Sequence, residues 1–228
     1  MSVQLPLHIG LRDSATFENF YAENNEQLIA ELRRCTINQG EHFIFFYGVS
    51  GVGKSHCLQA VCHAATGQRL QATYLPMREI QSMPIELLEG LEQFNVVCID
   101  DIELIAGDQK WEEAIFNLYN RIRDNQGHLI VTASAKFDEL GLDLKDLQSR
   151  LGWGLVYKLE SLDDKALAMA LQLRAKARGM ELPDDVVAYI LKRSTRDMNT
   201  LFSLLEKLDR ESLVEQRKLT IPFVKNYL

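Results

Sequence analysis

The sequence predicts an α/β fold, a three-layer αβα domain around a parallel sheet, with a small all-helical domain after it. Two observations predict the first domain. Short apolar runs alternate with helical patterns, and a glycine-rich phosphate-binding pattern connects the first run to the helix after it. A third observation predicts the second domain, because residues 163–228 carry helical patterns alone.

The elements follow one another in a regular order. Residues 1–15 lack sustained periodicity and are expected to form an extended arm. Leu28, Ile29, Leu32 and Cys35 form the stripe of an amphipathic helix, and the aromatic run 42–47 is typical of a buried parallel strand. The remaining strands are expected at 72–75, 96–99, 129–131 and 155–159, with helices at 54–65 and 111–124.

The helical region is expected to form a separate domain. Asp163 or Asp164 can cap its first helix, which Gly179 closes, and Pro183 opens the second. A third helix is expected over 196–213, and Thr220 caps a short last one. We therefore expect an arm at 1–15, a nucleotide-binding domain at 16–162 and a helical lid at 163–228.

Composition and charge exclude several classes of protein. The 228 residues are 46% hydrophobic and 25% charged, which is ordinary globular composition and excludes a disordered or coiled-coil chain. The net charge of −7 argues against a nucleic-acid binder held by a basic surface. The four cysteines form no C-x-x-C pair, so neither a zinc site nor a redox motif is indicated. With no signal pattern or membrane span, we expect a cytoplasmic protein that makes no membrane contact.

One motif predicts a nucleotide site. Residues 48–55 match G-x-x-x-x-G-K-[ST] at every fixed position, between a predicted strand and a predicted helix. Glycines let the loop backbone turn its N–H groups toward a phosphate, Lys54 would reach the β- and γ-phosphates, and Ser55 would bind Mg²⁺. The candidate nucleotide ligands here are Gly48, Gly51, Val52, Gly53, Lys54, Ser55 and His56.

A second acidic motif completes the expected site. The apolar run 96–99 ends in Asp100 and Asp101. In phosphate-loop proteins the first acid assists Mg²⁺ and the next orients the attacking water. Such a run is weak evidence alone, but it is strong evidence downstream of a phosphate loop in a parallel sheet. Neither motif decides whether the nucleotide is hydrolysed or only held.

Four segments together resemble one family. They are Thr16-Phe17-Glu18-Asn19-Phe20, Cys98-Ile99-Asp100-Asp101-Ile102, Leu147-Gln148-Ser149-Arg150-Leu151-Gly152-Trp153-Gly154, and the stretch 182–193. They resemble the AAA+ ATPases, and within these the DnaA family of replication initiators and their smaller homologues. The resemblance covers about residues 16–210.

The resemblance implies roles for particular residues. Phe17 and Phe20 would lie against the adenine, Thr132 would be the polar sensor 1 residue, and Arg150 would be an arginine finger acting on a neighbouring subunit. Asn199 stands where initiators carry a phosphate-contacting arginine, and an asparagine cannot supply that charge. Weak or no intrinsic turnover is therefore expected, with preference for a diphosphate. Arg196 either substitutes for that arginine or serves as a solvated cap.

Two further features narrow the function. The chain ends at Leu228, which leaves no room for the DNA-reading helix-turn-helix of initiators, so no sequence-specific DNA contact is expected. The arm residues Gln4, Leu5, Pro6, Leu7 and Ile9 resemble the short peptide with which bacterial proteins dock on the DNA polymerase sliding clamp. A glutamine followed by apolar side chains on a proline-stiffened backbone suits a hydrophobic groove.

The leading hypothesis is an inhibitor of replication initiation. With ADP or ATP and Mg²⁺ in its own site, the protein would dock on the DNA-loaded clamp and promote hydrolysis of DnaA-bound ATP through Arg150. The alternative is a self-assembling ATPase such as a helicase loader, in which Arg150 acts on an identical neighbour. A small-molecule kinase is a poorer reading, because several phosphate-clamping arginines and an acceptor pocket are not recognisable.

Overall fold

A five-stranded, all-parallel sheet forms the centre of the base domain in this computed structural model, which describes residues 15–228. The strand order is β2-β3-β4-β1-β5. The strands are β1 (Phe43–Tyr47), β2 (Ala72–Pro76), β3 (Val96–Asp100), β4 (His128–Ala133) and β5 (Leu155–Lys158). The predicted fold class is confirmed, and each strand lies within two residues of its expected position.

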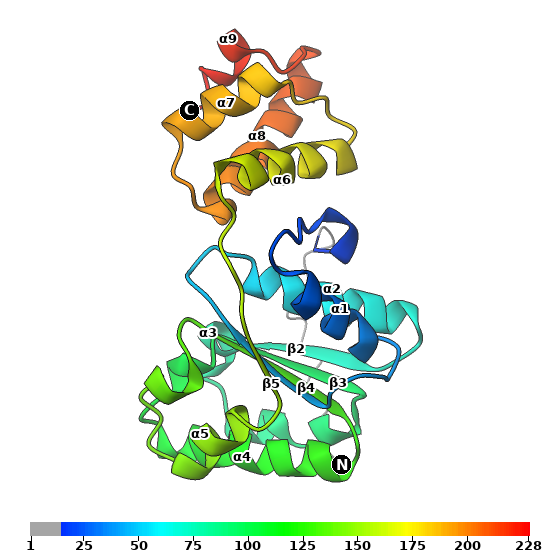
Figure 1. The fold of residues 1–228 in the computed structure, drawn as a ribbon, viewed down its shortest axis with the longest axis vertical. Helices are drawn as coiled ribbons and strands as arrows, with labels where there is room; N and C mark the ends of the chain where they lie inside the picture. The colour runs from blue at the N-terminus through cyan, green and yellow to red at the C-terminus, as the bar shows by residue number, and fades with distance from the viewer. Residues whose placement is uncertain (1–14) are drawn as a thin grey trace.

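Helices cover both faces of this sheet (Figure 1). One face carries α1 (Glu26–Cys35) and α2 (Lys54–Gly67), and the other carries α4 (Gln109–Asp124) and α5 (Lys145–Leu151). Successive strand residues point to opposite faces: Val97 and Val131 pack beneath α4, while Cys98 and Ile130 pack beneath α2. Apolar residues are needed on both faces, which explains the continuous apolar runs in the sequence.

The carboxyl ends of the strands converge on one edge of the sheet. Because β1 and β4 are parallel, with Phe46 opposite Thr132, the loop after β1 begins beside the end of β4. The Gly48 N–H donates to the Ala133 carbonyl at 3.1 Å and fixes that position. In open parallel sheets this edge is where ligands bind.

The lid is a separate helical unit above the base (Figure 1). It consists of α6 (Asp164–Ala177), α7 (Asp184–Arg193), α8 (Met198–Glu215) and α9 (Ile221–Val224), which share their own apolar core. The Asp163 carboxylate caps α6 by accepting the Ala166 N–H at 2.8 Å. The third lid helix begins two residues later than expected, because Asp197 is its N-cap and accepts the Thr200 N–H.

Two short α-helices of the base domain were not expected from the sequence. They are α3 (Met77–Ile80), which follows β2, and α5, which carries Arg150 in its last turn. Both contain too few residues to show a helical period. Within residues 15–228, no helix is long and apolar enough to span a membrane.

Candidate nucleotide-binding site

A cavity of about 390 Å³ lies between the base and the lid. Its floor is the phosphate-binding loop and the start of α2, from Ser50 to His56. One wall comes from the segment around Phe20 and Tyr21, and the roof comes from α6 and α8. This size is in the range of small-molecule sites.

The phosphate-binding loop is built around glycines in left-handed backbone conformations. Gly51 has φ of +77° and Gly53 has φ of +110°, which other residues rarely adopt. Lys54 is buried, and its Nζ donates to the carbonyl oxygens of Gly48 at 2.9 Å and Val49 at 3.4 Å. The lysine therefore lies inside the loop. Gly53 is the N-cap of α2, so the positive end of that helix dipole faces the loop.

The lid touches this loop at Gly51. A Cβ atom built on Gly51 would collide with Oδ2 of Asp197, the N-cap of α8. The other carboxylate oxygen of Asp197 accepts the Thr200 N–H at 2.8 Å and the Thr200 hydroxyl at 2.9 Å. The missing side chain at position 51 thus lets the lid pack directly on the loop.

Asp100 is a buried acid of the site with two hydrogen-bond donors. Its carboxylate is buried and accepts hydrogen bonds from the Tyr74 hydroxyl at 2.7 Å and from the Thr132 hydroxyl. Burial, followed by the Asp100 charge, raises the pKa of Tyr74 well above its usual value, while hydrogen bonds with Gln59 and Ser55 oppose that shift. Tyr74 thereby links the two residues expected to hold Mg²⁺, Ser55 and Asp100.

Asp101 has a different environment from its neighbour. Its backbone is left-handed, with φ of +56°, and its N–H donates to the Thr132 hydroxyl at 3.2 Å. Its carboxylate lines the cavity and lies 3.6 Å from the Arg78 guanidinium. Burial and the charges of Asp100 and Glu103 raise the pKa of Asp101, although Lys54 and Arg78 act in the opposite direction.

The expected adenine wall is divided between cavity and core. Phe20 lines the cavity, with its ring 5.5 Å from that of His56, whose Nε2–H donates to the Thr16 carbonyl. Phe17, in contrast, is buried among α1 and α2 side chains beneath the Arg33 guanidinium, and among the described residues it is not one that lines the cavity. This geometry does not support a direct contact of Phe17 with a base, because the Phe17 ring lies in the core cluster against which Phe20 packs.

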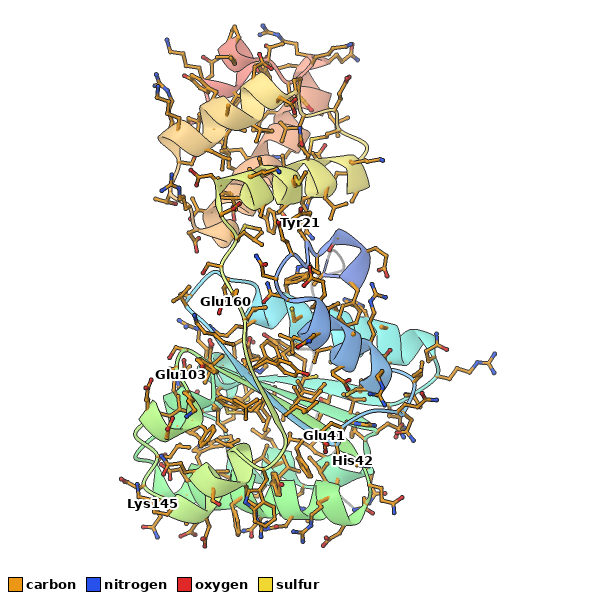
Figure 2. The ribbon with its side chains drawn as sticks, in the orientation of Figure 1. Tyr21, Glu41, His42, Glu103, Lys145 and Glu160 are labelled. Atoms are coloured by element: carbon orange, nitrogen blue, oxygen red, sulfur yellow. The ribbon has the colours of Figure 1, made fainter. Side chains whose placement is uncertain are left out.

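Tyr21 connects the same segment to the lid. Figure 2 shows Tyr21 between the base and α6, and its hydroxyl lies 2.9 Å from the Met169 sulfur. Glu160, on the connection to the lid, also lines the cavity. Its backbone N–H donates to the Asn25 side chain at 2.8 Å, so α1 is bonded to the point where the lid begins.

Arg150 lies elsewhere. Of the residues that the structure describes, those lining the cavity do not include it. Its guanidinium stacks 3.8 Å from the centre of the Trp153 ring and 5.8 Å from that of Tyr119. The site of Lys54, Asp101 and Phe20 is thus formed without Arg150.

The lid residues expected near the phosphates give a mixed result. Arg196 is bonded to Asp164 by two contacts, of 2.7 and 2.8 Å, and points away from the nucleotide cavity into a separate groove. The cap of α8 is Asp197 and not Arg196. The Asn199 side chain and the arm residues Gln4 to Ile9 lie outside the described residues.

Several residues in or next to the site were not found from the sequence, among them two arginines that line the cavity and a tyrosine bonded to Asp100. Arg78 stands in α3, Arg174 lies in α6 with its guanidinium 5.0 Å from the Phe202 ring, and Tyr74 reaches Asp100 from β2. Each approaches the site only through the folding of distant segments.

Two family models match the chain. The model of the bacterial DnaA ATPase domain matches residues 11–158, and the model of the Hda lid domain matches residues 163–228. Together they cover both the sheet domain and the helical lid.

Solved structures share the fold. Domain III of the Thermotoga maritima replication initiation protein DnaA is 19% identical, with a TM-score of 0.80 over 95% of this chain and 96% of that one. AMPPCP-bound DnaA from Aquifex aeolicus is 21% identical, with a TM-score of 0.72 over 91% and 71%. The RuvB Holliday junction branch migration motor of Thermotoga maritima is 17% identical, with a TM-score of 0.67 over 90% and 67%.

Proposed function

Because the chain belongs to the bacterial DnaA ATPase domain family, as an Hda-like DnaA homologue, we propose that it is a cytoplasmic negative regulator of chromosome replication initiation. In this proposal it binds the DNA-loaded sliding clamp and stimulates hydrolysis of ATP held by DnaA. DnaA is left with ADP and is inactive for initiation.

The observation that carries the proposal is the position of Arg150. It lies in the last turn of α5, whose buried residues Leu147 and Leu151 anchor the helix to the base, and it does not contribute to the described lining of the chain's own cavity. An arginine placed in this way can act on a nucleotide bound to another subunit. There water adds to the γ-phosphorus, the bond to the bridging oxygen breaks, and ADP leaves with the electron pair while the guanidinium stabilises the developing charge.

The chain's own site is proposed to hold ADP or ATP with Mg²⁺. The glycine-lined loop, buried Lys54 and the cavity under the lid fit a nucleotide. Ser55 and Asp100 would hold Mg²⁺, since both offer the oxygen ligands that Mg²⁺ prefers. Bound there, the cation would screen phosphate charge, and Thr132 and Tyr74 keep the Asp100 oxygens oriented. The nucleotide is proposed to fix the angle between lid and base, with weak turnover or none.

The proposed contact with the clamp uses Gln4, Leu5, Pro6, Leu7 and Ile9. Their support is the sequence pattern, an anchoring glutamine followed by apolar side chains. Ala15, the last residue of the proposed arm, is one of the residues that line the nucleotide cavity.

Hydrolysis of DnaA-bound ATP tests this function directly. Labelled ATP on DnaA is followed with clamp loaded on DNA, in the presence and absence of this protein. We expect strong stimulation by the parent protein and loss of stimulation with Arg150→Ala and with Gln4→Ala. When the clamp is omitted, the parent protein and Gln4→Ala should give the same low rate. Full stimulation by Arg150→Ala would disprove the finger assignment.

The arrangement of polar residues in the chain's own site supports one alternative. Lys54 bonds within the loop, and Thr132 bonds both Asp100 and Asp101, an arrangement that would suit a self-assembling ATPase such as a helicase loader. That function predicts ATP turnover that rises with protein concentration in the absence of DnaA. Absence of such turnover would exclude this alternative and favour the regulatory function.

A further inference from the structure

The turn that follows α5 holds a tryptophan outward. Gly152, Trp153 and Gly154 join α5 to β5, and the Trp153 side chain is 64% exposed. A Cβ atom on Gly152 would lie 2.7 Å from the Phe137 ring, and one on Gly154 would collide with the Phe43 carbonyl. Both glycines are thus pressed against the base, and the Trp153 N–H donates to the Arg150 carbonyl at 3.1 Å. The backbone beside the tryptophan has little freedom to move.

Trp153 stacks on the guanidinium of Arg150. The guanidinium carbon lies 3.8 Å from the centre of the indole system, a distance typical of direct stacking. The buried ring of Tyr119 lies 5.8 Å away on α4 and is itself stacked on Phe43. The arginine is therefore placed by two aromatic rings, one in the turn before β5 and one on α4 that packs on Phe43 of β1.

The hydrogen bonds of Arg150 are incomplete. Its Nη1 is buried and has no hydrogen-bond partner among the described residues. Stacking occupies the flat face of a guanidinium and not its in-plane N–H groups, so the N–H groups other than those of the buried Nη1 stay available to oxygen acceptors such as a phosphate. Stacking thus suits a residue that must be held in place in the free protein and still bind an anion in a complex.

From these contacts we propose that Trp153 is a positioning residue for Arg150, which it holds toward the γ-phosphate of an ATP bound to DnaA. The inference rests on the proposed function of Arg150 and adds a second residue to it. Trp153 acts through stacking and the rigid turn, so its loss should lower the maximal hydrolysis rate and not the concentration needed for half-maximal stimulation.

The test measures the maximal hydrolysis rate and the concentration for half-maximal stimulation, for four variants and one control variant, in the reaction with DnaA, ATP and DNA-loaded clamp. We expect Trp153→Ala to lower the maximal rate about tenfold, and Trp153→Phe to restore it to within about threefold of the parent protein. Arg150→Ala should remove stimulation, and Arg150→Ala with Trp153→Ala should be no worse than Arg150→Ala alone. Leu213→Ala, which removes a 73% exposed apolar side chain from the lid, is the matched control and should keep full stimulation.

The outcomes separate the inference from the function beneath it. If Arg150→Ala abolishes stimulation while Trp153→Ala leaves the maximal rate intact, Trp153 has no positioning role and the proposed function stands. If Arg150→Ala itself stimulates fully, the proposed function fails and the inference fails with it. A lower thermal midpoint in Trp153→Ala, with no recovery of rate by Trp153→Phe, would reveal a purely structural residue and overturn the proposal.

Discussion

At Gly51 the absence of a side chain lets the lid touch the phosphate-binding loop. Two separate costs would follow from Gly51→Ala: a left-handed φ of +77° for a residue with a Cβ, and collision of that Cβ with Asp197. We expect nucleotide affinity to fall at least tenfold, because the collision pushes α8 away from the cavity and adds to the roughly 1–2 kcal/mol of backbone strain.

Gly107→Ala is the matched control for that variant. Gly107 also has a positive φ, of +82°, but nothing lies within 4 Å of its added Cβ. It should lose stability from the backbone alone and keep its affinity, as measured by titration with a fluorescent nucleotide. Equal affinities for the two variants would show that the contact between lid and loop does not influence binding.

His128 gives a pH dependence at the opposite end of the strands. Burial lowers the pKa of His128 below its ordinary value of 6.5, and the stacked His42 adds to this. Its Nδ1–H donates to the Glu41 carbonyl at 3.0 Å, while its buried Nε2 has no partner among residues 15–228. Protonation would therefore bury an unpaired N–H that carries positive charge. Figure 2 shows Glu41 and His42 at the end of the sheet away from Glu103.

The sign of this effect follows from proton binding by the unfolded chain. Below pH 6.5 His128 binds a proton in the unfolded state but not yet in the folded state, where its pKa is lower. The free energy of unfolding therefore falls as pH falls. Denaturant midpoints should thus decrease between pH 7 and pH 5. His128→Gln should flatten this decrease, and an unchanged slope in that variant would exclude His128 as its source.

At the scale of elements, α5 depends on a buried carboxylate in another helix. Glu112 of α4 is fully buried and accepts backbone N–H groups from Gly107 at 2.8 Å, Asp143 at 3.2 Å and Leu144 at 2.7 Å. Leu144 is the N-cap of α5, so Glu112 fixes the beginning of the helix that carries Arg150 in its last turn. Three peptide groups thus depend on one side chain.

Glu112→Ala should cost on the order of 3 kcal/mol in the free energy of unfolding, because these N–H groups lose a charged acceptor. Stimulation of DnaA-bound ATP hydrolysis should fall as well, since α5 loses its fixed start. Denaturant unfolding measures the first effect. Glu113→Ala, at the exposed neighbouring position, should change stability by less than about 0.5 kcal/mol. A similar small change in Glu112→Ala would contradict this role.

The long elements were predictable and the short ones were not. The helices α1 and α4 show an apolar stripe over several turns, and the strands show apolar runs next to turn residues. In contrast, α3 and α5 span less than two full helical turns, so their sequences carry no period to detect. Tertiary contacts hold them, such as the burial of Leu147 and Leu151 beneath α5.

For the whole molecule, the cavity between base and lid makes stability depend on ligand. A ligand that binds only the folded state stabilises it by about 2.7 kcal/mol at one hundred times its Kd. For a chain of this size we expect ADP with Mg²⁺ to raise the thermal midpoint by roughly 5–10 °C. Differential scanning fluorimetry would measure the shift, and Lys54→Ala should remove it while Lys110→Ala, an exposed lysine on α4, should keep it. No shift with the parent protein would argue against a nucleotide at Gly48–Ser55.

The sequence alone determined the parallel α/β class, the helical lid, the phosphate-binding loop and the family resemblance. These features depend on local spacing: apolar periods, glycines beside Lys54, and two carboxylates at the end of one strand. Only the tertiary structure decided which distant residues meet. It brought Tyr74 to Asp100, Asp197 to Gly51 and Trp153 to the Arg150 guanidinium, and it placed Phe17 in the core. The physical reason is that such contacts depend on how layers and domains pack, and spacing along the chain does not specify packing between distant segments.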